Sequence, residues 1–415
     1  ALMSAENDTA RHDDGVYTFT MPQPIPSYLM ALAVGDLDFK SLGDNCGVFA
    51  EPALVDRSAW EFADLSQMIS SAEELYGPYA WGRYDLLVLP PSFPFGGMEN
   101  PRITFATPTI IAGDRSLVAL VAHELAHSWS GNLVTNATWN DFWLNEGFTV
   151  YFELRIMEKI YGKDYADMLA QLSLMDLKET IEELGADSRD THLYLDLEGR
   201  DPDDGVTSIA YDKGCMLLTT IENAVGREKW DAFLNKYFDA HAWGTMTTEQ
   251  FLTYLDEELI KGDDSLKAAI NLDAWIYGPG LPDNCPVINS TELQKADAAA
   301  QEFKNGSAAS GIDTSGWTTH HWLYFLRTIG PPLATEQITD LDDTFGLTNS
   351  GNSEIQCEWY QLSINSGSEK AYPAMRDFLL KVGRRKFLKP IYTQLAKTPD
   401  GKELALDIYG EARPG

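Results

Sequence analysis

Cysteine is scarce in this 415-residue chain, and so are side chains of positive charge. The four cysteines lie far apart without metal-type spacing, which favours free thiols in a reducing, cytoplasmic compartment; they are Cys46, Cys215, Cys285 and Cys357. Lys and Arg number 31 against 63 Asp and Glu, a formal net charge of −32. Because so acidic a chain repels nucleic acid and anionic membrane surfaces, neither is expected as a partner.

Long apolar runs are absent as well. The longest candidate, residues 28–34, has the length of a strand, whereas a membrane-spanning helix needs about 18 apolar residues, so membrane insertion is not expected. Hydrophobic residues make up 44% and charged residues 23%, which indicates a folded chain, and the length suggests two or three domains. The chain begins at Ala1 without a signal-peptide pattern, and because Ala1 is not an initiator methionine we expect the natural N-terminus to lie upstream.

The hydrophobic pattern changes along the chain. Residues 15–40 are rich in β-forming side chains and predict two strands, the end of a larger β structure whose beginning is missing. The period of a helix then follows at 58–76, and a buried strand is expected at 84–89 with a short edge strand at 103–105. Among the helices expected further on, 116–133 is one of the longest.

The second half is helical, apart from a linker marked by the composition GPGLPDNCP. We therefore expect an α+β fold that is mainly α. Its parts are the remnant of an N-terminal β domain at 1–37, a catalytic domain at 38–278, the linker at 279–287 and an α-helical stack at 288–415.

The pattern H-E-x-x-H occurs once, from His123 to His127, inside a predicted helix. Histidines four residues apart lie on one helix face, so both imidazoles can bind a single tetrahedral ion. Glu124 lies beside that ion without being a ligand, where it can deprotonate a zinc-bound water. The pattern predicts a catalytic zinc site, and the alternative is two surface histidines with a nearby glutamate.

A third zinc ligand has to come from another part of the chain. Eighteen residues separate His127 from Glu146, which begins the next long helix in the run WLNEGF. A helix, a loop and a returning helix would bring this carboxylate opposite the histidine pair. The alternative for Glu146 is a helix N-terminal charge favoured by the helix dipole, but that role does not explain the spacing.

H-E-x-x-H-x(18)-E together with GGMEN, residues 96–100, resembles the gluzincin aminopeptidases. The runs PPSFPFGGMENP, GNLVTNATWNDFWLNEG and GRRKFLKP are similar to the leukotriene A4 hydrolase branch, over essentially the whole chain. The resemblance implies a thermolysin-like zinc domain followed by the helical stack, with one zinc ion per chain.

The resemblance also implies roles for the residues around the zinc. Glu99 binds the substrate's α-ammonium group and thereby limits cleavage to one residue. The backbone of Gly96, Gly97 and Met98 lines the peptide like an added strand. Tyr211, in the run SIAYDKG, stabilises the oxyanion. Without the resemblance, GGMEN would be an ordinary turn and Tyr211 a half-buried helix aromatic.

Five cations occur within nine residues of this acidic chain: Lys381, Arg384, Arg385, Lys386 and Lys389. They are explained either by a helix C-terminus capped by Gly383, whose dipole favours cations, or by substrate binding. The resemblance implies that Arg384 and Lys386 hold the substrate's C-terminal carboxylate, and we expect both to lie in a turn.

Another assignment by resemblance is Asp203, at the end of the pocket for the first side chain; the alternative is a solvated acidic turn. The chain also departs from the family pattern. Val206 and Phe95 stand where leukotriene hydrolases carry tyrosines, and the β domain is missing. The two substitutions concern the lipid or side-chain pocket and leave the zinc ligands intact. By the resemblance, the missing β domain supplies glutamines that help to bind the α-amine, so we expect part of the pocket for the first residue to be absent.

The sequence therefore predicts a zinc-dependent aminopeptidase, expected to be a monomer, that removes the first residue from short peptides with a free N-terminus. Two alternatives remain. One is an epoxide hydrolase of the leukotriene type that uses the same zinc, against which Val206 counts. The other is a scaffold without catalysis, although every expected catalytic residue is present.

Overall fold

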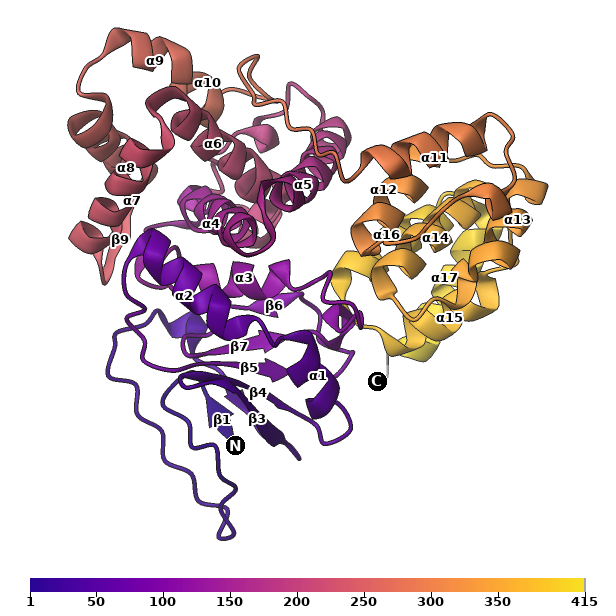
Figure 1. The fold of residues 1–415 in the computed structure, drawn as a ribbon, viewed down its shortest axis with the longest axis horizontal. Helices are drawn as coiled ribbons and strands as arrows, with labels where there is room; N and C mark the ends of the chain where they lie inside the picture. Colours follow the sequence, from indigo (N-terminus) through magenta and orange to yellow (C-terminus); the bar gives the residue numbers. More distant parts are fainter. Residues whose placement is uncertain (414–415) are drawn as a thin grey trace.

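The computed structural model describes residues 1–413. A sheet-containing region lies on the N-terminal side, a block of helices covers it, and a second helical block stands beside both (Figure 1). The sheet and the first block share one hydrophobic core that extends from Cys46 to Ile276, whereas the second block has its own core between Ala296 and Ile408. The predicted zinc ligands thus belong to the first body, and Arg384 and Lys386 come from the second.

The central sheet has five strands in the order β3-β4-β5-β7-β6. Its inner strands run parallel, and the two edge strands pair antiparallel with their neighbours. The strands are β3 (Asp38–Gly43), β4 (Cys46–Ala50), β5 (Tyr84–Val88), β7 (Ile103–Ala106) and β6 (Gly97–Met98). The GGMEN motif therefore forms an edge strand, where backbone groups are free to pair with a peptide.

Strands β4 and β5 are buried along their whole length because both faces of the sheet are covered. Successive side chains of a strand point to opposite faces, so Val48 joins the large core while Phe49 packs in a smaller cluster with Leu2. The first face carries helices α1 (Val55–Glu61) and α2 (Leu65–Tyr76).

Helix α4 (Trp143–Tyr161) is the centre of the first helical block and contacts α3, α5 and α6. Its backbone comes close to the start of α6, since a Cβ atom on Gly147 would lie 2.8 Å from the Cα atom of Gly214. Helix α3 also contacts β6, so it lies between the sheet edge and α4. The other helices of this block are α3 (Ala119–Ala126), α5 (Lys163–Leu184), α6 (Gly214–Val225), α7 (Arg227–His241), α8 (Thr248–Leu255), α9 (Asp264–Ile270) and α10 (Leu272–Ile276).

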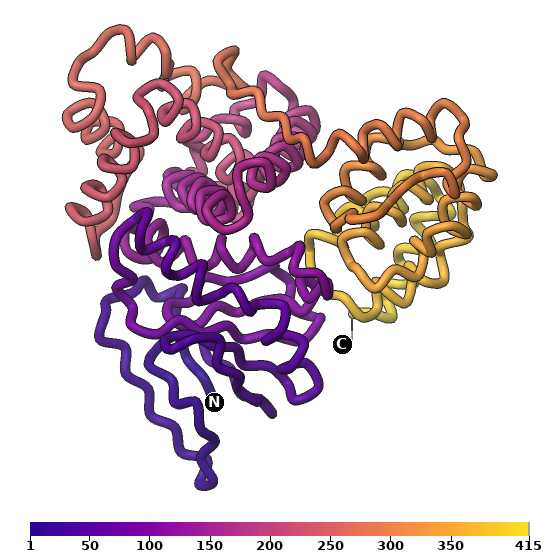
Figure 2. Tube along the Cα trace, viewed as in Figure 1, coloured from indigo at the N-terminus to yellow at the C-terminus, as the bar shows by residue number. Residues whose placement is uncertain are grey.

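After α10 the chain crosses once, in an extended stretch, to the second helical block (Figure 2). This block packs against the first partly through α12 on α5. Its helices are α11 (Gln294–Lys304), α12 (Thr319–Ile329), α13 (Thr335–Phe345), α14 (Ser353–Asn365), α15 (Tyr372–Lys381), α16 (Arg385–Leu395) and α17 (Pro399–Ala412).

The predicted fold class, α+β and mainly α with a terminal helical stack, is confirmed. The predicted domain bounds stay a prediction. No helix within residues 1–413 has both the length and the apolar character to cross a membrane.

Several predicted elements differ from the structure. Between residues 15 and 37 the chain forms the short strand β2 (Leu32–Ala33), paired with β1 (Leu2–Met3), because the prolines interrupt the ladder, and β3 begins only at Asp38. The predicted helix at 58–76 is divided into α1 and α2, and the one at 116–133 is only α3. The predicted edge strand at 103–105 is the inner strand β7, because GGMEN pairs outside it.

Candidate active site

The three predicted zinc ligands meet between two helices. His123 lies in α3 and His127 follows its last residue, while Glu146 lies in the first turn of α4. All three are buried or nearly so. The Nε2 atoms of His123 and His127 lie 3.3 and 3.5 Å from Oε2 of Glu146.

The distances between these three donor atoms match those expected around a single metal ion. Donor atoms about 2.0–2.1 Å from a tetrahedral zinc ion are about 3.3–3.4 Å apart, close to the separations seen here. Oε2 of Glu146 is buried and has no hydrogen-bond partner within residues 1–413. Two imidazoles and one carboxylate around such an unsatisfied oxygen are the donor set of a catalytic zinc site.

The other nitrogen of each imidazole is held in place. Nδ1 of His123 lies 3.0 Å from a carboxylate oxygen of Glu153, two turns along α4 from Glu146. Nδ1 of His127 lies 3.0 Å from the carbonyl oxygen of Ser130 and 3.1 Å from Oγ1 of Thr149. When Nδ1 donates to these acceptors, the Nε2 lone pairs are left for the metal.

Glu124 faces strand β6, the edge of the sheet that the GGMEN motif forms. Its carboxylate packs directly on Gly97, because a Cβ atom built there would lie 2.2 Å from Oε1 of Glu124. Burial raises the pKa of this carboxyl group well above its usual value. The glycine that the resemblance assigns to peptide binding therefore has a second role, which is to leave space for the predicted base.

Glu99 follows strand β6 and reaches the same space. Its carboxylate, that of Glu124 and an imidazole nitrogen of His127 each offer an atom within 4.8 Å of the others. Burial raises the pKa of Glu99. The backbone at the end of the GGMEN motif is held by a hydrogen bond, because the side-chain amide of Asn132 donates to the Glu99 carbonyl oxygen at 2.9 Å.

Tyr211 lies in a π-helical turn, Ile209–Lys213, just before α6. Such turns are rare and often mark functional sites. Its ring stacks on His123 at a centroid distance of 6.1 Å. Burial and the nearby carboxylates raise the pKa of Tyr211 well above its usual value, so the phenol keeps its proton and can donate it in a hydrogen bond.

Arg384 reaches the site from the second helical block. It precedes α16 and is only 6% exposed, and its Nη1 atom lies 3.0 Å from Oγ1 of Thr109. A Cβ atom on Gly96 would lie 2.7 Å from Nη2 of Arg384, so the guanidinium borders the GGMEN edge. Lys386 is more exposed and shares the carboxylate of Glu354 with Arg384.

The location of this cationic cluster corrects two expectations. Arg384 is the N-cap residue of α16, and Lys386 lies in the first turn of that helix, so the two do not share a turn after a helix cap. Cations at a helix N-terminus oppose the helix dipole. The explanation by a favourable helix C-terminus is therefore wrong for these two residues, and substrate binding stays a prediction.

Asp203 lies exposed in a 3₁₀ turn, Pro202–Gly205, where its backbone N–H donates to Asp201. Its predicted role in the pocket stays a prediction.

Two residues near the site were not predicted. Glu153 follows Glu146 by seven residues on the same helix, a spacing that could have indicated it, whereas Glu354 lies thirty residues before Arg384 without any signal.

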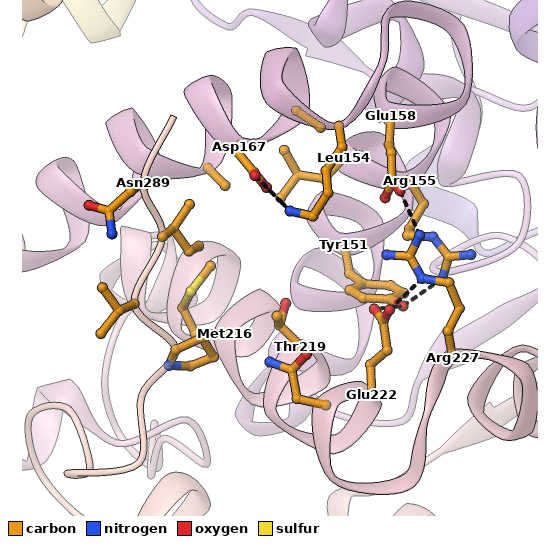
Figure 3. A pocket seen from close by; sticks show the side chains of 17 residues that line it. Tyr151, Leu154, Arg155, Glu158, Asp167, Met216, Thr219, Glu222, Arg227 and Asn289 are labelled. Atoms are coloured by element: carbon orange, nitrogen blue, oxygen red, sulfur yellow. Dashed lines mark hydrogen bonds and ion pairs between the residues drawn. The ribbon is translucent and has the colours of Figure 1, made fainter. Parts of the chain in front are cut away.

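A different cavity, of about 380 Å³, lies among α4, α5, α6 and the crossing segment (Figure 3). Its charged side chains already have ion-pair partners: Arg227 pairs with Glu158 and Glu222, Lys163 with Asp167, and Arg155 with Asp231. Because none of its lining residues is a predicted ligand or catalytic residue, this cavity is separate from the metal site.

An H-E-x-x-H helix and a glutamate from the next helix define a hydrolytic metal centre. The chain belongs to peptidase family M1. Residues 60–275 match the Peptidase family M1 domain, and residues 317–415 match Leukotriene A4 hydrolase, C-terminal. The predicted resemblance to the leukotriene A4 hydrolase branch is confirmed.

Individual relatives support the same family assignment. Leucine aminopeptidase 2 of Ajellomyces capsulatus is 35% identical over 97% of this chain and 66% of that protein, and that of Yarrowia lipolytica is 39% identical over 92% and 62%. A solved structure of yeast LTA4 hydrolase with bestatin has a TM-score of 0.90 and 32% identity, and covers 100% of this chain and 70% of that one. The chain thus spans about two thirds of the length of the curated relatives it matches.

Proposed function

We propose that this chain is the catalytic part of a zinc aminopeptidase that removes the first residue from short peptides. The observation that carries the proposal is the arrangement of His123, His127 and Glu146 around an unsatisfied carboxylate oxygen, beside an edge strand that ends at Glu99. The names of the relatives, leucine aminopeptidase 2, support the same activity.

The side chains divide the reaction among them. Bound at the three ligands, one zinc ion would polarise the scissile carbonyl and lower the pKa of a water molecule. Glu124 takes the proton of that water and passes it to the leaving amine. Tyr211 donates a hydrogen bond to the oxyanion. The free edge of β6 aligns the peptide, and the second helical block provides Arg384 and Lys386 for its C-terminal carboxylate.

Glu99 explains why the enzyme would be an exopeptidase. A buried carboxylate at the end of the peptide-binding strand pairs with a free α-ammonium group but leaves no place for a further residue. The expected substrates are therefore short peptides with a free N-terminus, cleaved by a monomer.

Epoxide hydrolysis has less support. Val206 is 51% exposed in place of the family tyrosine. The curated relatives named above are aminopeptidases by name, which favours peptide hydrolysis.

Hydrolysis of aminoacyl-anilides of Arg, Lys, Leu, Ala and Phe tests the proposal, with a matched N-acetylated series as control. The zinc-loaded protein should cleave at least one free-amine substrate and none of the acetylated ones. Equal rates on both series would contradict the role of Glu99. A lack of activity on all anilides and short peptides would contradict the function itself.

A further inference from the structure

A buried carboxylate already forms ion pairs with Arg384 and Lys386, the two cations near the GGMEN edge of the sheet. Glu354, in the first turn of α14, has a side chain that is only 7% exposed. Its Oε1 atom lies 3.4 Å from Nη1 of Arg384 and 3.0 Å from Nζ of Lys386, and its Oε2 atom lies 2.8 Å from the same Nζ. Both cations pull the pKa of Glu354 below its usual value despite the burial. Part of the positive charge at this position is therefore cancelled before any substrate binds.

Arg384 needs such a counter-ion, because a buried charge is costly unless it is paired. Its pairing is nevertheless incomplete. Nε of Arg384 is buried and finds no hydrogen-bond partner within residues 1–413, and Nη2 is directed at Gly96 on the edge of the sheet. The guanidinium is thus held in position by Glu354 and Thr109 while two of its nitrogens remain available to a second acceptor.

The neighbouring cation does not add to this charge. Arg327 of α12 lies 2.8 Å from a carboxylate oxygen of Asp176 and 2.8 Å from one of Glu358, so two carboxylates more than balance its single positive charge. The cluster of Arg384, Lys386 and Glu354 consists of two cations and one anion, which leaves one positive charge. A single peptide carboxylate neutralises that charge.

We propose that Glu354 is a positioning residue that sets how tightly the enzyme holds the C-terminal carboxylate of its substrate. It orients Arg384 and Lys386 and reduces their combined charge to one. The inference rests on the aminopeptidase function proposed above. Without Glu354, two positive charges would bind the carboxylate more tightly, in the substrate and in the shortened product alike, and the product would leave more slowly.

The test compares a tripeptide with its C-terminal amide in the zinc-loaded enzyme, and the measured quantity is the ratio of KM for the amide to KM for the acid. Glu354→Gln keeps the shape and an acceptor oxygen but removes the charge, so this ratio should rise about tenfold. Lys386→Gln leaves no net charge in the cluster, so the ratio should fall about tenfold. The double variant restores one positive charge and should return the ratio to near that of the wild type.

Glu354→Asp is the matched control, because it keeps the charge and should change the ratio by less than about threefold. Equal changes in KM on acid and amide in Glu354→Gln, or a lower ratio, would overturn the inference. If Glu354→Gln fails to fold, Lys386→Gln alone decides, since Lys386 is half exposed, and an unchanged ratio there would overturn the inference too. Wild-type protein without activity on any peptide would instead refute the aminopeptidase function.

Discussion

Two clusters border the GGMEN edge of the sheet but are built differently: the metal site, and the cluster of Arg384, Lys386 and Glu354, called here the carboxylate site. The metal site takes its three ligands from two consecutive helices within 24 residues, so a fixed spacing in the sequence defines it. The carboxylate site joins α14, the start of α16 and the 3₁₀ turn at Thr109, which are up to 275 residues apart in the sequence. Local spacing can be recognised in one sequence, whereas a site assembled by domain packing shows only its charged residues.

The two sites also neutralise charge differently. At the metal site, the carboxylates of Glu99, Glu124 and Glu146 gather around the imidazole of His127, where a bound cation would balance them. At the other site, the single carboxylate of Glu354 already balances one of the two positive charges. The metal site therefore depends on a bound ion, and variants there should have larger effects than variants at the carboxylate site.

The largest effect is expected from Glu124→Gln. Because it removes the base but spares the ligands, kcat should fall about 10²- to 10⁴-fold with zinc retained. Steady-state kinetics and elemental analysis on the same sample measure both. Glu228→Gln, on the exposed face of α7, is the control and should behave as the wild type. Loss of zinc in Glu124→Gln would show that Glu124 is misassigned.

A single methyl group should disturb the metal site almost as much. In Gly97→Ala the new Cβ atom would overlap Oε1 of Glu124, so the carboxylate has to move, and kcat/KM should fall about a hundredfold. Gly311→Ala, where no atom lies within 4 Å of the new Cβ, is the control. Wild-type kinetics in Gly97→Ala would refute the close packing of Glu124 on the sheet edge.

At the carboxylate site, Arg384→Ala should be selective for the substrate. Loss of a charge-assisted contact should lower kcat/KM about 10- to 150-fold on a tripeptide, and much less on its amide or on an anilide. The exposed neighbour Arg385 is the matched control, and Arg385→Ala should leave all three rates close to those of the wild type. Equal losses on the three substrates in Arg384→Ala would indicate a structural role.

The smallest effect concerns stability at the domain contact. His320 of α12 meets Tyr165 of α5, and burial lowers the pKa of its imidazole to about 4. Between about pH 4 and 6.5 this histidine binds a proton in the unfolded chain but not in the folded chain. The free energy of unfolding should therefore fall by about 1 kcal/mol for each unit by which the pH is lowered. Denaturant unfolding of His320→Gln should show a shallower pH dependence than the wild type. If the unfolding free energy of the variant and of the wild type changed equally with pH, the lowered pKa of His320 would be contradicted.

Much of the metal site could be predicted from the sequence because helix geometry relates spacing to position. His123, His127 and Glu146 meet as their spacing implied, and Glu153 follows the same rule at one more helical repeat. Strand order could not be predicted. The inner position of β7 depends on the pairing of GGMEN outside it, a contact that no local pattern encodes.

The start of α16 shows the same limit. By the helix dipole alone, a run of five cations indicates a helix C-terminus, and only packing places Arg384 before α16 and near Gly96. Glu354 carried no signal, because a glutamate in the first turn of a helix is common. Its role depends on a contact between α14 and the cations thirty residues later, which only the folded chain brings together.

The central claim is that His123, His127 and Glu146 hold one catalytic zinc ion. Titration of chelator-treated protein with zinc, while anilide hydrolysis is followed, tests it most directly. Activity should be absent at the start, rise in proportion to added zinc and level off at one ion per chain. Full activity before any zinc is added, or a plateau only at two ions per chain, would contradict the claim.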